Sequence, residues 1–192
     1  IEDFMEALHV HKIYIVAGEK AWHATRAYLP ESIVKNTRTN FSFIDGYCTL
    51  EKVEEISEQI SLCSADAVLG IGGGTVLDIT KAAAVQADVK SILVPTIAAT
   101  CAAWTPLSVF YDENGRFTHF TEFPLANTLV CIEPSIIANA PLKYLRAGIG
   151  DTLAKYYEAD ALVASFYENK AYPVWLQVSQ FLAKICKEVL LE

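Results

Sequence analysis

The sequence predicts an α/β fold in which a parallel sheet is built from strands that alternate with helices. Short apolar runs alternate with segments of roughly ten residues or more that have helical periodicity. After Asp66, the run 67–71 is apolar throughout, which is typical of a strand buried on both faces. A glycine cluster, Gly72 to Gly74, joins this run directly to a helical pattern. Together these features indicate a doubly covered, Rossmann-like sheet.

The first half of the chain supplies the alternating elements of this sheet. Thr49 is expected to cap a helix whose apolar side chains recur at helical spacing, and Gly18 lies in the turn after the first strand. The expected strands cover residues 11–17, 40–45, 66–71 and 91–95. The expected helices cover residues 21–29, 50–62 and 75–87.

The chain changes character after Pro95. Residues 96–106 are small, hydroxyl-bearing and without periodicity, and an Asn-Gly pair between two strand-like runs indicates a hairpin. Further strands are expected at 107–111, 117–123 and 128–132, short helices after Pro134 and Pro141, and long helices at 149–166 and 174–191. We place a domain boundary near Arg146, with a nucleotide-binding domain over 1–146 and the first helices of a second, helical domain over 147–192.

Composition excludes several classes of function. The 192 residues are 53% hydrophobic and carry a net charge of −8, so neither nucleic acid nor an anionic membrane is an expected partner. No apolar run is long enough to cross a membrane. The five cysteines form no CxxC pair, which favours a reducing cytoplasm over a disulfide framework or a thiolate zinc site. Because the chain opens at Ile1, residues upstream are expected.

The glycine cluster predicts an anion site. Glycines let a ligand approach the backbone, and the helix that follows presents free N–H groups and a positive dipole end. Phosphate or pyrophosphate is the usual anion at such a place. The pattern is neither G-x-G-x-x-G nor a P-loop, so a tight turn that only packs closely stays an alternative. Asp78 is expected to accept hydrogen bonds from loop amides or from the cofactor.

Other chemistry-bearing residues are few. Cys101 has no histidine nearby in the sequence and is expected to line a crevice rather than act as a nucleophile. Asp151 is expected at the start of a helix, either as a first-turn carboxylate or as a metal ligand. Lys81 and Lys155 lie on helices and are expected to be solvated. The four histidines, His9, His11, His23 and His119, offer no convincing metal site with Asp151.

Three segments together resemble the iron-containing (group III) alcohol dehydrogenase superfamily, in its glycerol dehydrogenase and hydroxycarboxylate dehydrogenase-like branch. They are GIGGGTVLDITK at 70–81, VPTIAATCAAWTPLSVFY at 94–111 and AGIGDTLAKYYEA at 147–159. The resemblance covers essentially the whole chain, but proteins of this family continue well past the position of Glu192. It implies a dehydroquinate synthase-like fold, in which the sheet domain is followed by an all-helical metal-binding domain.

The resemblance implies reversible oxidation of the CH–OH group of a small molecule by NAD or NADP with a divalent metal, Zn or Fe. Asp151 would be the first metal ligand and thus catalytic, whereas two histidine ligands would lie beyond Glu192. Gly72, Gly73, Gly74 and Thr75 would hold the dinucleotide pyrophosphate. The cofactor would also be lined by Thr96, Ala99, Thr105, Leu107 and Tyr111. A homo-oligomer is expected.

Two departures from the family pattern bear on specificity. Cys101 stands where glycerol dehydrogenases have an aspartate that contacts the polyol, so a 2-hydroxy or 2-oxo acid is favoured over glycerol. At the turn after the first strand, Gly18 occupies the expected place of an acidic residue and Lys20 is near, which favours NADP although Glu19 opposes it. The alternatives are a nucleotide-binding protein without turnover and, less favoured, a dehydroquinate synthase-like lyase.

Overall fold

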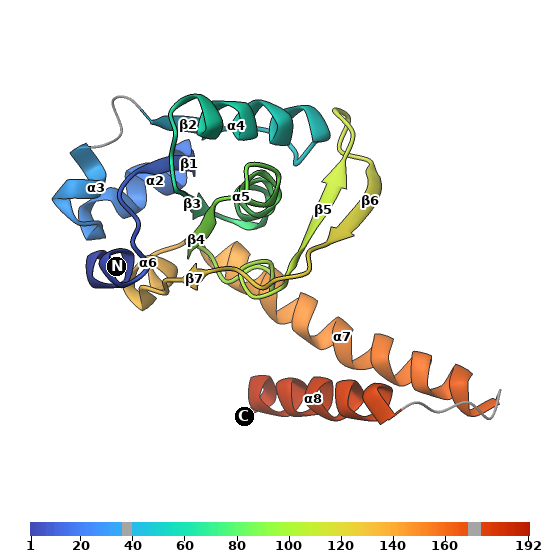
Figure 1. Ribbon diagram of the computed structural model, residues 1–192. Helices are drawn as coiled ribbons and strands as arrows, with labels where there is room; N and C mark the ends of the chain where they lie inside the picture. The colour runs from blue at the N-terminus through green and yellow to red at the C-terminus, as the bar shows by residue number, and fades with distance from the viewer. Residues whose placement is uncertain (36–39, 169–173) are drawn as a thin grey trace. The chain divides into compact units, whose positions relative to one another are not determined.

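A computed structural model describes residues 1–35, 40–168 and 174–192 (Figure 1). The chain divides into two compact units: unit 1 comprises Ile1–Ile97 and Cys101–Ala140, and unit 2 comprises Ala98–Thr100 and Pro141–Glu192. The strands are β1 (Ile13–Gly18), β2 (Phe41–Ile44), β3 (Ala67–Gly72), β4 (Lys90–Pro95), β5 (Leu107–Tyr111), β6 (Phe117–Glu122) and β7 (Leu129–Val130). The helices of unit 1 are α1 (Glu2–Ala7), α2 (Glu19–Thr25), the 3₁₀ turn η1 (Arg26–Tyr28), α3 (Glu31–Lys35), α4 (Leu50–Leu62), α5 (Gly74–Gln86) and α6 (Pro134–Ala138).

Unit 1 is built on a five-stranded sheet in the order β2-β1-β3-β4-β7, and every pairing in it is parallel. The predicted α/β class is therefore confirmed. Since neighbouring strands run the same way, the carboxyl ends of β1, β3 and β4 lie at one edge of the sheet. The expected hairpin is also present, with β5 and β6 forming a separate antiparallel pair.

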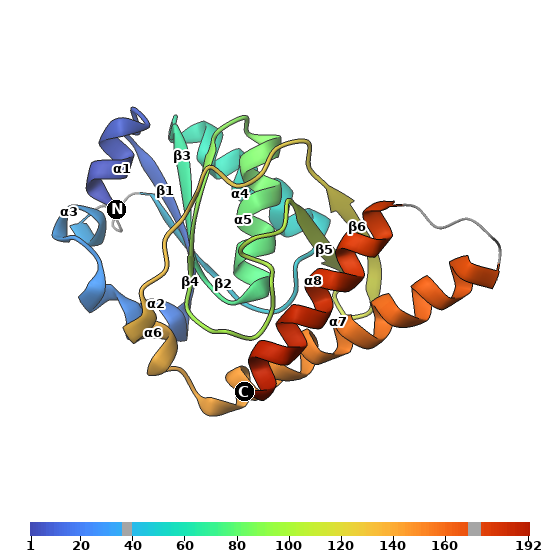
Figure 2. The same cartoon turned by 90° about the horizontal axis from the view of Figure 1, so that it is seen from below.

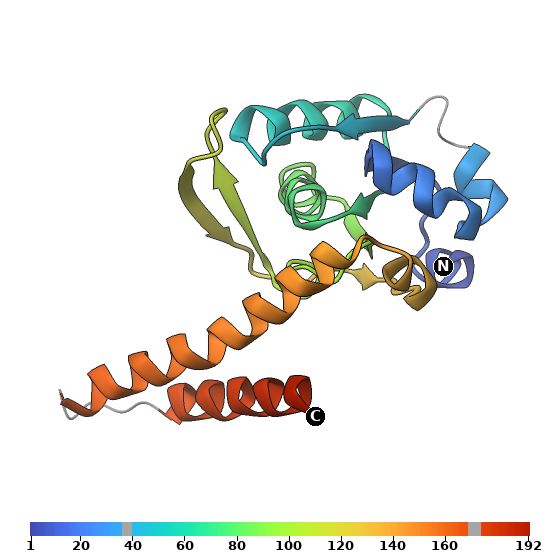
Figure 3. The same cartoon turned by 180° about the vertical axis from the view of Figure 1, so that it is seen from behind.

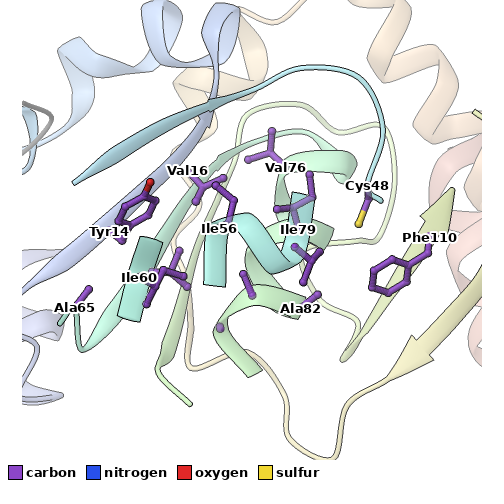
Figure 4. Packing of buried hydrophobic residues seen from close by; sticks show 14 residues of the cluster. Tyr14, Val16, Cys48, Ile56, Ile60, Ala65, Val76, Ile79, Ala82 and Phe110 are labelled. Carbon is purple, nitrogen blue, oxygen red and sulfur yellow. The ribbon is translucent and has the colours of Figure 1, made fainter. Parts of the chain in front are cut away.

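Helices cover both faces of the sheet because its central strands are apolar on both sides. Tyr14 and Val16 point to the layer of α4 and α5, whereas Ile13 and Ile15 point to the opposite layer with Trp22 of α2. Figure 2 shows α4 and α5 on one side of β1, β3 and β4, and α1, α2, α3 and α6 on the other. Figure 4 shows the first core, which extends from Tyr14 along α4 and α5 to Phe110 of β5.

Several element boundaries agree with the sequence prediction because their local signals are strong. Thr49 caps α4 by accepting a hydrogen bond from the Lys52 amide at 3.3 Å, and α4 covers the predicted residues. Pro134 occupies the first turn of α6, where its missing N–H costs nothing. The short helices α1 and α3 were not predicted, because five or six residues are too few to show helical periodicity.

Unit 2 contains two long helices, α7 (Leu142–Glu168) and α8 (Val174–Leu191), which pack on each other. The Lys187 ammonium lies 4.0 Å from the Tyr156 ring centre, and Gln180 Nε2 donates to Asp160 Oδ1 at 2.9 Å. α7 is continuous, so the separate helices expected after Pro141 and from residue 149 are wrong. The contacts divide the chain at Pro141, whereas the boundary expected near Arg146 falls inside α7.

Close packing of α5 on β3 depends on two glycines of the strand. A Cβ at Gly70 would lie 2.8 Å from Thr80 Cβ, and a Cβ at Gly72 would lie 2.7 Å from Val76 Cβ. Real side chains do not tolerate such approaches, and both neighbours are held in the body of α5. Gly70 and Gly72 are therefore required for close packing of the helix on the strand. This packing does not exclude an anion site at the residues that follow.

Gly70→Ala should destabilise unit 1 by about 1–3 kcal/mol, because the added methyl group forces β3 and α5 apart. Urea unfolding followed by circular dichroism measures this difference in the free energy of unfolding. Gly18→Ala is the matched control, since a Cβ there meets only ordinary contacts at 3.7 Å. The control should stay within about 0.5 kcal/mol of the parent chain. Equal effects of the two changes would contradict the packing role.

Candidate nucleotide-binding site

The ends of three neighbouring strands lie at the candidate site. The Thr96 amide donates to the Gly72 carbonyl at 3.0 Å, so the segment that leaves β4 begins beside the glycine turn that leaves β3. Gly18 caps α2 at the end of β1, and Lys20 is exposed in the first turn of that helix. The structure thus brings Gly18, Gly72 and Thr96 to the same edge, as the parallel sheet requires.

The N-terminus of α5 has the properties of an anion site. Gly73 is its N-cap, with a φ of −87° and no side chain to accept a capping hydrogen bond. The first turn carries no acidic residue. The first hydrogen bond of the helix runs from the Leu77 amide to the Gly73 carbonyl, so the amides of Gly74, Thr75 and Val76 come before it. A Cβ at Gly73 would contact only the mobile end of the Ile97 side chain, at 2.7 Å. The cradle therefore fits a phosphate group that binds backbone amides.

One turn further along α5, a lysine in a buried ion pair holds the helix to the segment after β4. Lys81 Nζ lies 2.8 Å from Asp78 Oδ1, and the lysine side chain is only 1% exposed. The same ammonium donates to the carbonyls of Ala102 at 2.8 Å, Thr105 at 3.3 Å and Leu107. The expectation of a solvated Lys81 is wrong, because backbone carbonyls replace its water.

Asp78 anchors the hairpin at the same point. Its Oδ2 accepts a hydrogen bond from the Val109 amide at 3.2 Å, and its carbonyl accepts one from Ser108 Oγ at 2.7 Å. Burial raises the pKa of the Asp78 carboxyl group, while the neighbouring Lys81 ammonium acts in the opposite direction. Of the two partners expected for Asp78, loop amides and cofactor, the structure shows a loop amide. Contact of Asp78 with a cofactor stays a prediction.

The remaining residues of the expected cofactor lining lie in several different places. Thr96 is buried at the sheet edge, whereas Thr105 and Leu107 are half-buried and carry the carbonyls that bind Lys81. Tyr111 is half-buried at the far end of β5, where its amide donates to the Cys48 carbonyl at 2.8 Å. Ala99 belongs to unit 2, where the Ala98 carbonyl carbon would lie 2.9 Å from a Cβ at Gly148.

Cys101 is exposed, and its expected role as a residue that lines the substrate crevice stays a prediction. Its carbonyl accepts a hydrogen bond from the Trp104 amide at 2.9 Å, and Trp104 is 62% exposed rather than part of the core. Cys48 has the opposite environment, since burial raises the pKa of its thiol to about 12. Cys101 is thus an accessible side chain in the segment that Lys81 anchors.

Asp151 does not form a metal site with the residues described. It lies inside α7 rather than at a helix start, so its expected first-turn position is wrong. Its Oδ2 is 2.6 Å from Lys155 Nζ, and both side chains are half-exposed. Within residues 1–35, 40–168 and 174–192, no three His, Cys, Asp or Glu side chains are placed to bind one metal ion. These residues supply one candidate ligand and not a complete centre.

Asp45 is a residue at the site edge that the sequence reasoning missed. β2 pairs with β1 so that Ile44 lies opposite Gly18, and Asp45 follows immediately at the carboxyl end of β2. It is exposed, and its Oδ1 accepts a hydrogen bond from the Gly46 amide at 2.8 Å. In dinucleotide-binding folds an acidic residue in such a position binds ribose hydroxyls. The sequence signal for this residue was its position at the end of the strand 40–45, in which polar and apolar residues alternate.

Residues 1–134 match the sequence profile described as iron-containing alcohol dehydrogenase. Hydroxycarboxylate dehydrogenase A of Escherichia coli is 38% identical over 191 residues, which cover 100% of this chain and 51% of that protein. Glycerol dehydrogenase of Thermotoga maritima is 36% identical over 155 residues, which cover 81% of this chain and 42% of that protein. The chain spans about half the length of the curated relatives it matches.

Solved structures agree with the fold. A glycerol dehydrogenase from Schizosaccharomyces pombe superimposes with a TM-score of 0.69 at 26% identity, over 85% of this chain and 42% of that one. A sulfoacetaldehyde reductase from Bifidobacterium kashiwanohense, solved in complex with NAD+, gives a TM-score of 0.67 at 20% identity, over 83% and 48%. Among the described helices, none combines the length and the hydrophobicity needed to cross a bilayer.

Lys81→Met should destabilise unit 1 by about 3–5 kcal/mol, because it leaves the Asp78 carboxylate buried without its cation. The double variant Asp78→Asn/Lys81→Met should lose less than the sum of the two single changes, since removing both charges removes the isolated one. Urea unfolding of all four chains measures the coupling. Lys35→Met, which breaks an exposed pair with Glu31, should cost no more than about 0.5 kcal/mol. Additive losses would disprove the buried pair.

Proposed function

Because the chain belongs to the iron-containing alcohol dehydrogenase family, we propose that it binds a nicotinamide dinucleotide for oxidoreduction of a small alcohol or a 2-hydroxy or 2-oxo acid. The observation that carries this proposal is the N-terminus of α5. A pyrophosphate suits its first-turn amides, because the N-cap Gly73 has no side chain to bind them and the first turn has no acidic residue. The bound nicotinamide supplies the hydride acceptor or donor.

Residues of this chain have distinct roles in the proposal. The amides of Gly74 and Thr75 bind the pyrophosphate oxygens, while Lys81 holds the segment from Ala102 to Leu107 in place beside them. Cys101 presents an exposed thiol on that segment. A thiol does not accept hydrogen bonds from several hydroxyl groups as a carboxylate does, and it does not repel an anionic substrate. We therefore favour a hydroxycarboxylate over glycerol.

Metal assistance is the part of the family chemistry that the described residues do not supply. Asp151 is paired with Lys155, and among the described residues no group of three possible metal ligands forms around it. Nucleotide binding without turnover is therefore the second candidate function for the chain of 192 residues. Titration with NADH followed by an assay with Zn²⁺ or Fe²⁺ and a 2-oxo acid separates the two candidates. A dehydroquinate synthase-like lyase stays the less favoured alternative.

Thr75→Asp should weaken NADH binding about tenfold or more, because it places a carboxylate among the amides that would receive the pyrophosphate. The same carboxylate should leave the helix as stable or raise its stability by about 0.3–1 kcal/mol, so lost binding would not reflect unfolding. Isothermal titration calorimetry measures the affinity, and thermal unfolding measures the stability. Thr75→Asn, which has nearly the same shape without the charge, should retain binding. Unchanged affinity in Thr75→Asp would refute the site.

Two charged residues at the strand ends should set the cofactor preference in opposite directions. Lys20→Ala should lower the affinity for NADPH relative to NADH, as expected if the ammonium attracts a 2′-phosphate. Asp45→Asn should raise that ratio, because it removes a carboxylate that repels the phosphate and binds ribose hydroxyls. Each change should be about two- to fivefold, in keeping with exposed charges. Titration of both nucleotides against both variants tests this, and shifts in the same direction would contradict it.

A further inference from the structure

The loop between β2 and α4 carries an exposed aromatic residue, Tyr47, two positions after Asp45. The Tyr47 side chain is 45% exposed. It is nevertheless held against the hairpin, because a Cβ at Gly115 would lie 2.5 Å from Tyr47 Oη and 2.7 Å from its Cε2. The ring therefore lies directly on the glycine of the hairpin turn, where a side chain would displace it. Figures 1 and 3 show this turn beside the start of α4.

The backbone of this loop is fixed on both sides of Tyr47. After it, the Cys48 carbonyl accepts a hydrogen bond from the Tyr111 amide at 2.8 Å. The rings of Tyr47 and Tyr111 have their centres 6.0 Å apart. Before it, Lys52 Nζ donates to the Asp45 carbonyl. Tyr47 thus offers an exposed ring in a defined position, and a ligand that stacks on it has little side-chain freedom to remove.

Two residues of the proposed cofactor site lie on either side of this ring. Asp45 follows β2 at the sheet edge, where an acidic residue binds the adenosine ribose in dinucleotide-binding folds. Tyr111 belongs to the expected cofactor lining, and its ring is the neighbour of Tyr47. Adenine is joined to that ribose by a single bond, so it lies close to any carboxylate that binds the ribose hydroxyls. Tyr47 is the aromatic side chain that the loop presents beside Asp45.

An aromatic ring suits adenine in its chemistry as well as in its place. A purine base has flat π-faces, and stacking on an aromatic side chain is a common way in which proteins bind such bases. Gly115 covers one part of the Tyr47 ring, and the exposed part is open to a ligand. The Asp45 carboxylate accepts hydrogen bonds but cannot stack. The loop therefore supplies one group for the sugar and another for the base.

We propose that the adenine of the dinucleotide stacks on Tyr47, and that the hairpin turn at Gly115 holds the ring in place for it. The inference rests on the proposed function, since it concerns the same cofactor. It gives the hairpin a role in the site. β5 and β6 support the adenosine half through Gly115, while Lys81 supports the segment after β4.

Tyr47→Ala should raise the dissociation constant of NADH about tenfold or more, because it removes the stacking surface. ADP-ribose, which has the adenine but no nicotinamide, should lose affinity by the same factor. Reduced nicotinamide mononucleotide, which has no adenine, should bind Tyr47→Ala and the parent chain equally. Isothermal titration calorimetry of the chain of 192 residues measures all three ligands. An equal loss for the mononucleotide would indicate general damage to the site and would overturn the stacking role.

Further variants separate the ring from the loop that carries it. Tyr47→Phe keeps the ring and should bind NADH within about twofold of the parent chain, whereas Tyr47→Leu is apolar without a ring and should lose affinity as Tyr47→Ala does. Gly115→Ala should also weaken NADH binding, because its methyl group would occupy the place of the Tyr47 ring. Tyr28→Ala is the matched control, since Tyr28 is 48% exposed at the end of η1 and should leave binding unchanged. Thermal unfolding checks that each variant is folded at the titration temperature.

The results distinguish this inference from the proposed function. A parent chain that binds no NADH would overturn both. NADH binding in the parent chain that neither Tyr47→Ala nor Gly115→Ala weakens would overturn the stacking role alone and would leave the proposed pyrophosphate site at α5 standing.

Discussion

The ion pair between Lys81 and Asp78 is the contact that ties the parts of unit 1 together. The two side chains lie on the same face of α5, and from there the Lys81 ammonium reaches the carbonyls of Ala102, Thr105 and Leu107 in the segment after β4. The lysine satisfies these carbonyls from inside the protein, and the aspartate neutralises the lysine while binding the Val109 amide. A single turn of α5 therefore fixes the helix, the segment that borders the site and the hairpin. The cost of burying these charges is offset only because every partner is in place.

The glycines around β3 have two different purposes that the sequence does not separate. Gly70 and Gly72 allow α5 to lie close to the strand, where Thr80 and Val76 leave no space for a Cβ. Gly73 instead is the N-cap of α5, and no side chain accepts a capping hydrogen bond there. Close packing and the proposed anion site therefore follow from consecutive residues of one short segment. The packing brings the helix near the sheet edge, and the uncapped end then points its dipole to that edge.

The sequence predicts well the features that depend on local signals. The limits of α4, the hairpin at Asn114 and Gly115, and the parallel order of the central strands all follow from caps, turns and periodicity. The sequence does not predict features that depend on residues far apart in the chain. A lysine inside a helix is usually solvated, and nothing near Lys81 in the sequence shows that three carbonyls more than twenty residues away surround it. Likewise, Pro141 and two glycines suggest broken helices, yet α7 is continuous and Gly148 allows the backbone of Ala98 to approach it.

Nucleotide binding and metal-assisted turnover make different demands on the chain. An anion site at a helix N-terminus uses backbone amides, so it needs only a correctly placed helix and small residues before it. Unit 1 supplies both through its core and the Lys81 network. A catalytic metal needs three side chains that converge from separate positions, and the described residues provide Asp151 in a pair with Lys155 instead. The geometry of α5 is complete without that centre. The proposed dinucleotide binding therefore depends on unit 1 and not on the metal ligands, so loss of turnover would not argue against the nucleotide site.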